Sequence, residues 1–164
     1  MSEQTQCNSG FAPLEFIAES LAEVLRERCP EFEKVMYTAA TNAAQLYRML
    51  DTLKNAPGAI VCIGGTTYPE NGKGMVRELA VIIAVSDAYK RTTSDRAAGI
   101  WPLVRAVERV FLPAAEPDGC YSFPEAAGIE WTLESSRAAD SDERTSLFFV
   151  NLKGIEYYVN ETVR

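Results

Sequence analysis

The most apolar and β-branched stretch of the sequence lies at residues 75–87, which read MVRELAVIIAVSD. In its first half Arg77 and Glu78 point to opposite sides of an extended chain, whereas residues 79–85 are apolar on both sides. A strand with this pattern starts at a solvated edge and runs into a region that is covered on both faces. We therefore predict that residues 75–87 form the central strand of a small sheet against which helices pack, with Asp87 as a turn or cap residue.

Two segments before this strand have the apolar periodicity of amphipathic helices. Pro13 opens the first, Cys29-Pro30 ends it, and its apolar stripe consists of Leu14, Ile17, Leu21, Val24 and Leu25. Such a stripe usually packs on the protein's own sheet, and a contact with another subunit is the alternative. The second helix is predicted at residues 41–53, where the NAPG turn at 55–58 ends it.

A third helix is predicted from the capping residues Ser94-Asp95 to about Leu112. Because Pro102 lies inside this pattern, either the first turn is distorted or the helix begins later than the cap indicates. Its buried face is predicted to consist of Ile100, Trp101, Val104, Val107, Val110 and Phe111, with Arg96, Arg105, Glu108 and Arg109 elsewhere.

The other strands are shorter or alternate in polarity. They are predicted at residues 32–37 (weakly), 59–63 (buried), 129–135 (half-buried, antiparallel) and 145–153, with an extension past a bulge to about 159. Turn-forming residues predict a long hairpin loop at 64–74 (GGTTYPENGKG), and charged residues predict a loop at 137–144 (RAADSDER). Residues 113–128 are predicted to be a loop with a short extended piece at 121–123.

This order of elements predicts an α+β fold with a mostly antiparallel sheet of about four to five strands, flanked by helices. Residues 1–10 are predicted to be a flexible N-terminal arm, and residues 11–164 a single α+β domain. The length of 164 residues and the hydrophobic content of 47% agree with one domain that has a sizeable core.

The charge balance argues against a nucleic-acid-binding protein. The formal net charge is -7, and a compact acidic protein is a poor candidate for phosphate contacts. The N-terminus has no basic region followed by an apolar one, so we expect no signal peptide and place the protein in a bacterial-type cytoplasm or in a particle assembled there.

Candidate chemistry is sparse. The sequence has no histidine, which removes Ser-His and Cys-His nucleophile pairs. The glycine-rich loop lacks the P-loop spacing and leads into a strand, and the acidic residues Asp140, Asp142 and Glu143 lack the EF-hand spacing. Among four cysteines without metal-ligand spacing, Cys62 is predicted to be buried, and Cys120 has no histidine to activate it. We therefore expect no enzyme activity and assign no catalytic residue, cofactor or metal.

The order and hydrophobic pattern of four segments resemble those of the phage tail terminator and tail-completion proteins, in particular the Mu-like prophage tail proteins. These segments are PGAIV at 57–61, RELAVIIAV at 77–85, VRAVERVFL at 104–112 and LFFVNL at 147–152. The resemblance spans roughly residues 14–158 and includes no catalytic signature.

This resemblance implies a structural protein of the virion tail, assembled in the host cytoplasm, with a tail-terminator-like fold. Such proteins form rings, usually hexameric, that end the tail tube and join it to head or neck proteins, with no membrane and no sequence-specific nucleic acid as partner. By analogy the contacts would come from the two polar loops, at Tyr68, Glu70, Asn71, Lys73, Arg137, Asp140, Asp142 and Arg144. A small-ligand-binding or regulatory α+β domain is the alternative.

Overall fold

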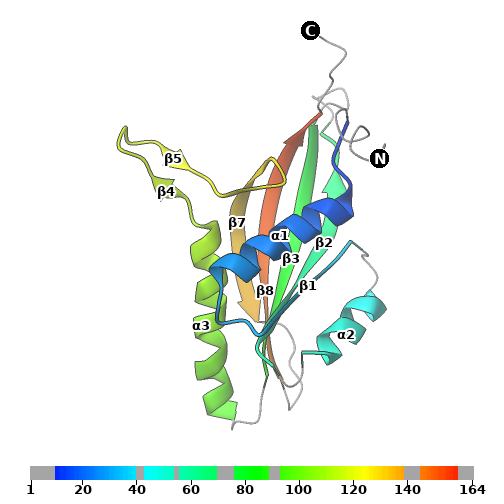
Figure 1. Cartoon of the computed structure of the whole chain (residues 1–164), viewed down its shortest axis with the longest axis vertical. Helices are drawn as coiled ribbons and strands as arrows, with labels where there is room; N and C mark the ends of the chain where they lie inside the picture. Colours follow the sequence, from blue (N-terminus) through cyan, green and yellow to red (C-terminus); the bar gives the residue numbers. More distant parts are fainter. Residues whose placement is uncertain are drawn as a thin grey trace.

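A curled six-stranded sheet forms the body of the molecule (Figure 1). The computed structural model describes residues 10–39, 43–53, 56–69, 76–88, 93–138 and 145–158. The helices are α1 (Leu14–Arg28), α2 (Ala43–Asp51) and α3 (Thr93–Phe111). The strands are β1 (Lys34–Thr38), β2 (Gly58–Thr67), β3 (Val76–Ala88), β4 (Ala114–Ala115), β5 (Tyr121–Ser122), β6 (Glu125–Ala126), β7 (Ile129–Ala138) and β8 (Thr145–Tyr157).

The strand order in this sheet is β1-β2-β3-β8-β7-β6. β1 and β2 run parallel because α2 lies between them in the chain, and parallel neighbours need such a crossover. All other neighbours are antiparallel. β3 pairs with β8 along its whole length, from Val76 opposite Tyr157 to Ala88 opposite Thr145. The prediction of a central strand at this place is therefore confirmed.

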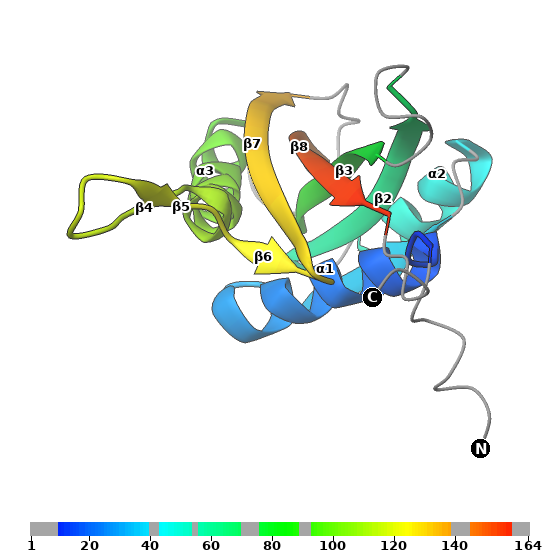
Figure 2. The same ribbon diagram turned by 90° about the horizontal axis from the view of Figure 1, so that it is seen from above.

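The main core fills the concave side of the sheet. Alternate residues of β3, such as Val81 and Ile83, point to this side, together with Val150 and Leu152 of β8. α1 lies across the opening of the curl and contacts strands at both edges, β1 and β6 (Figure 2). α3 packs on β3, β8 and β7 beside it. The first helix thus uses its apolar stripe for its own sheet, the commoner of the two arrangements.

A smaller cluster lies on the convex side, where α2 and the turn after it cover one part of the sheet. Leu53 packs there against Ile60, Cys62 and Ala84. The predicted burial of Cys62 is confirmed, since its side chain is 5% exposed. The remainder of the convex face, over β7 and the second half of β8, carries no helix among the described residues.

The predicted fold class is wrong in three respects. The sheet has six strands instead of four or five, it is mixed because of the parallel pair β1–β2, and it curls into a half-barrel, whereas the prediction was a sheet flanked by helices. The extended piece predicted at 121–123 is present as β5, but β4 and its pairing with β5 in a separate two-stranded sheet were not predicted. Short strands such as β6 bury few residues, so they leave no clear periodic signal in a sequence.

Several predicted boundaries shift because strands continue into residues that have the composition of turns. β2 continues through the two glycines at 64–65 to Thr67, with a register shift between Ile63 and Gly65. β7 continues to Ala138, and Asp87 lies buried inside β3. The predicted bulge in the last strand is absent from β8 between 145 and 157, whereas its neighbour β7 shifts register between Leu133 and Ser135.

α3 also departs from its predicted pattern. It begins at Thr93, before the expected cap, and continues through Pro102. Trp101 is 47% exposed, although the periodicity placed it on the buried face. Its ring packs on Phe148 with centroids 4.9 Å apart, so only part of the indole is covered.

β4 and β5 form an arm that projects from the body beyond the end of α3 (Figure 1). Every residue from 112 to 123 is exposed. The tip is closed by local bonds, in which Glu116 N donates to Cys120 O at 2.8 Å and Cys120 N donates to Asp118 Oδ1 at 3.0 Å. The two strands pair only with each other, so the arm adds nothing to the main sheet.

Candidate functional site

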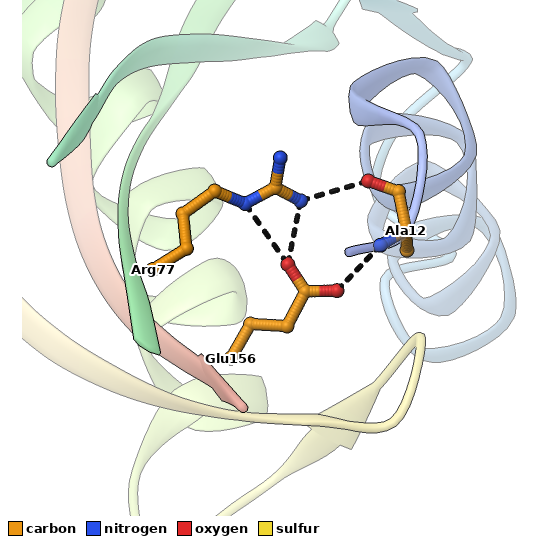
Figure 3. A network of polar contacts seen from close by, with 3 residues as sticks. All are labelled: Ala12, Arg77 and Glu156. Atoms are coloured by element: carbon orange, nitrogen blue, oxygen red, sulfur yellow. Dashed lines mark hydrogen bonds and ion pairs between the residues drawn. The ribbon is translucent and has the colours of Figure 1, made fainter. Parts of the chain in front are cut away.

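A buried ion pair anchors the start of α1 to one end of the sheet (Figure 3). Arg77 of β3 and Glu156 of β8 are direct neighbours in the register, and Arg77 Nε donates to Glu156 Oε1 at 3.0 Å. Arg77 Nη2 donates to the carbonyl oxygen of Ala12, and the N–H of Ala12 donates to Glu156 Oε2, each at 2.7 Å. The pair therefore satisfies both backbone groups of Ala12.

Aromatic side chains cover this anchor. The guanidinium carbon of Arg77 lies 4.9 Å from the ring centroid of Phe11, within the range of a cation–π contact. The Phe11 ring lies 5.9 Å from that of Tyr68 and 5.5 Å from that of Tyr158, the latter edge-on. Because these charged and aromatic groups already contact one another, we interpret this cluster as an anchor for the N-terminal segment, and not as a binding site.

The open part of the convex face carries a row of acidic residues. In the register Glu78 of β3 lies opposite Ile155 of β8, Ile155 opposite Glu130 of β7, and Glu130 opposite Glu125 of β6. These residues share one face, because side chains on neighbouring strands in register point the same way. Their side chains alternate with the core residues of the concave side, so the row belongs to the convex side.

A groove of about 590 Å³ lies over part of this row. It is lined by Phe123, Glu125, Gly128, Glu130, Thr132, Lys153, Ile155 and Tyr157. Three of these are exposed large apolar or aromatic residues, with Tyr157 at 68%, Ile155 at 41% and Phe123 at 39%. The groove thus combines apolar surface with carboxylates.

The two carboxylates that line the groove lack a described cationic partner. Lys153, which lines the groove, places its Nζ 3.5 Å from Oε1 of Glu78, a residue that does not line the groove. Within the described residues no lysine or arginine forms an ion pair with Glu125 or Glu130. Like charges directly opposite each other on neighbouring strands are destabilising. A cationic group from a partner would relieve this repulsion.

The structure describes two of the eight residues that the resemblance suggested as contacts. Tyr68 is 53% exposed and belongs to the aromatic cover of the anchor. Arg137, predicted in a loop, is an exposed residue of β7 opposite Phe149. The two are not brought together. Tyr68 follows Thr67, which lies opposite Glu78 of β3, whereas Arg137 lies opposite Phe149, which pairs with Ala84 of β3. Glu78 and Ala84 are six positions apart, or about 20 Å. Outside the described residues lie Glu70, Asn71, Lys73, Asp140, Asp142 and Arg144.

Two cysteines are core residues. Burial raises the pKa of the Cys29 thiol to about 11, with the nearby Glu31 carboxylate adding to the effect, and burial alone raises the pKa of Cys62 to about 11. Both thiols therefore stay protonated at neutral pH, which makes them poor nucleophiles and metal ligands. Cys120 is exposed on the arm.

Metal binding and membrane crossing find no support in the described part of the chain. No group of three or more cysteine or acidic residues there is placed to hold a metal ion. None of the described helices combines the length and apolar character that crossing a membrane requires. Comparison with known proteins adds no assignment, since no protein-family model and no curated protein sequence matches this chain.

The groove could not be predicted from the sequence. The alternation in residues 129–135 placed Glu130 on the polar face of its strand, which is correct. It contained no information that Glu125 lies opposite, because β6 is too short to be recognised. The exposed arginines of α3 were evident in the sequence but were not linked to any acidic surface.

Proposed function

We propose that this chain is a structural protein of the phage or prophage tail, of the terminator or completion type, which forms a ring at the end of the tail tube. In this role it stops tube growth and offers a surface to head or neck proteins. The class of protein is proposed from the four segments that resemble that family. The structural support comes from the exposed β4–β5 arm.

The observation that carries the proposal is the arm. A two-stranded hairpin without a hydrophobic face packed on something else is marginally stable in water. Here it exposes Tyr121 at 65%. Packing of the arm against a further surface would stabilise it. In an assembly, a neighbouring subunit can pack against such an arm and so stabilise it.

The acidic character fits the same role. A net charge of -7 disfavours adhesion to DNA, and a tail ring must let DNA pass. No step of the proposed role needs a catalytic group.

The test combines this protein with tail-tube protein from the same genome and follows the tubes by electron microscopy. We expect rings at the tube ends and shorter tubes. A variant with residues 114–122 replaced by a short Gly-Ser turn should fold, since β4 and β5 pair only with each other, and should leave the tube ends bare. Glu116→Gln, which keeps every apolar side chain of the arm, is the matched control. Wild-type protein that leaves the tube ends bare and tube length unchanged would overturn the proposal.

A ligand-binding domain is the second candidate, and the groove favours it. Its volume of about 590 Å³ lies within the range of small-molecule sites. A thermal-shift screen distinguishes the two, because a ligand that binds the native state raises the melting temperature with its concentration. A stoichiometric metabolite hit that Thr132→Trp abolishes would support this candidate over the ring.

A further inference from the structure

α3 carries an exposed stripe of basic and apolar side chains. Trp101, Arg105 and Arg109 are spaced by four residues, so they share one face of the helix, and Leu112 follows directly after the helix ends at Phe111. Trp101 is 47% exposed and Leu112 is 53% exposed. Arg105 forms no described ion pair, and Arg109 Nη2 lies 3.6 Å from Glu31 Oε1 in a solvated pair. Solvated ion pairs of this kind contribute little to stability, so Arg109 can exchange Glu31 for a carboxylate of a partner at little cost.

This stripe is complementary to the groove in both charge and polarity. The stripe offers two guanidinium groups between a tryptophan and a leucine. The groove offers Glu125 and Glu130 beside Phe123, Ile155 and Tyr157, and its one lysine, Lys153, pairs with Glu78 outside the lining. Tryptophan, tyrosine and arginine are the residues that most often dominate protein–protein binding energy. Two arginines would also neutralise the facing carboxylates of β6 and β7.

The stripe and the groove lie on different sides of the molecule. α3 packs on the concave side of the sheet, where its residues Val104 and Val107 join the main core. The groove lies on the convex side, because its residues Lys153 and Ile155 alternate with the core residue Leu152 and with Gly154. A contact between two different surfaces is heterologous, and repeated contacts of this kind close into a ring or extend as a filament.

We propose that the α3 stripe of one copy docks into the β6–β7–β8 groove of the next copy, and that this head-to-tail contact builds the ring. This inference rests on the proposed function and names the surfaces through which the copies meet. The arginines pair with Glu125 and Glu130, and Trp101 packs against the apolar part of the groove.

Charge reversal on each surface tests the contact. Variant A, Arg105→Glu/Arg109→Glu, has an acidic stripe and an acidic groove. Variant B, Glu125→Lys/Glu130→Lys, has a basic stripe and a basic groove. We expect each variant alone to self-associate at least about a hundredfold more weakly than wild type in size-exclusion chromatography with light scattering. An equimolar mixture of A and B should assemble, because every A–B contact is again between opposite charges. A single chain with all four substitutions should also assemble.

Matched controls separate local from global charge. Arg28→Glu/Arg48→Glu changes the net charge as variant A does, and Glu23→Lys/Glu27→Lys as variant B does, at exposed positions of α1 and α2. Both controls should assemble like wild type, and circular dichroism should show that A and B are folded.

The outcomes distinguish this inference from the proposed function. If variants A and B assemble as well as wild type, the proposed contact between stripe and groove is wrong. The proposal that the protein forms rings at tube ends would be unaffected by this result. If wild type stays monomeric at millimolar concentration and low salt, the head-to-tail contact is overturned, because it involves no other protein. Bare tube ends in the electron micrographs would overturn the ring function itself.

Discussion

Trp131 of β7 lies directly opposite Gly154 of β8, and its indole ring occupies the space that a side chain at position 154 would need. A Cβ atom there would lie 2.6 Å from Trp131 Cζ3 and 2.9 Å from Ile129 Cγ2. Trp131 is fully buried, and its Nε1 donates to the carbonyl oxygen of Ala126 at 3.2 Å. Packing therefore requires a glycine at position 154. Trp131 fills the concave side of β7 and β8, on the opposite face from the groove.

Substitution of this glycine should destabilise the protein. We expect Gly154→Ala to lower the free energy of unfolding by about 1–3 kcal/mol, because the buried ring must shift to admit the methyl group. Urea unfolding followed by tryptophan fluorescence measures the change. Gly65→Ala is the control, since nothing lies within 4 Å of a Cβ atom at that position, and it should be near neutral. Equal stability of Gly154→Ala and wild type would contradict the packing argument.

The anchor of α1 predicts a strong coupling between Arg77 and Glu156. Removing one partner leaves the other charge buried, which typically costs about 3–5 kcal/mol, so we expect Arg77→Met and Glu156→Met each to be strongly destabilising. The double variant should be more stable than the sum of the two single changes predicts. A double-mutant cycle from denaturant unfolding measures the coupling, and additive effects would refute it.

The buried thiols predict a loss of stability at high pH. Cysteine in the unfolded chain ionises near its ordinary pKa of 9.0, whereas folded Cys29 and Cys62 hold their protons to about pH 11. Between these values the native state binds more protons than the unfolded state, so stability falls as pH rises. Each thiol should account for about 1 kcal/mol per pH unit in this window and for no change below about pH 8.

Replacing a thiol by a small apolar side chain isolates this effect. The free energy of unfolding of Cys62→Ala should fall less steeply than that of wild type between about pH 9 and 11, with parallel curves below about pH 8. Titrations of tyrosine and lysine are common to both proteins and cancel in the difference. Parallel curves over the whole range would show that Cys62 ionises equally in both states.

The charge balance predicts no retention on duplex DNA. With a net charge of -7, the protein should pass a DNA column at moderate salt, because phosphates repel an acidic surface. Elution against salt concentration is the measurement. Retention that falls steeply with salt would contradict this expectation and reveal a local basic surface.

Local patterns predicted most elements, because each pattern depends on residues close together in the chain. The apolar stripe between Pro13 and Cys29 predicted α1, and the β-branched run predicted β3 as the central strand. The predicted strand ends were wrong where pairing with a neighbouring strand extends the strand into residues typical of turns. β2 continues through two glycines because β3 pairs with it there, and Arg137 belongs to β7 because β8 extends that far.

The sequence by itself determined the three helices and the longer strands, and it determined the acidic balance and the lack of histidine chemistry, since these are properties of neighbouring residues and composition. Only the tertiary structure decided that β1 joins β2 in parallel, that Glu125 lies opposite Glu130 on the neighbouring strand, and that about half of Trp101 is exposed. These features depend on which strands pair and on how much of each face a remote helix covers, and no pattern along one segment encodes either.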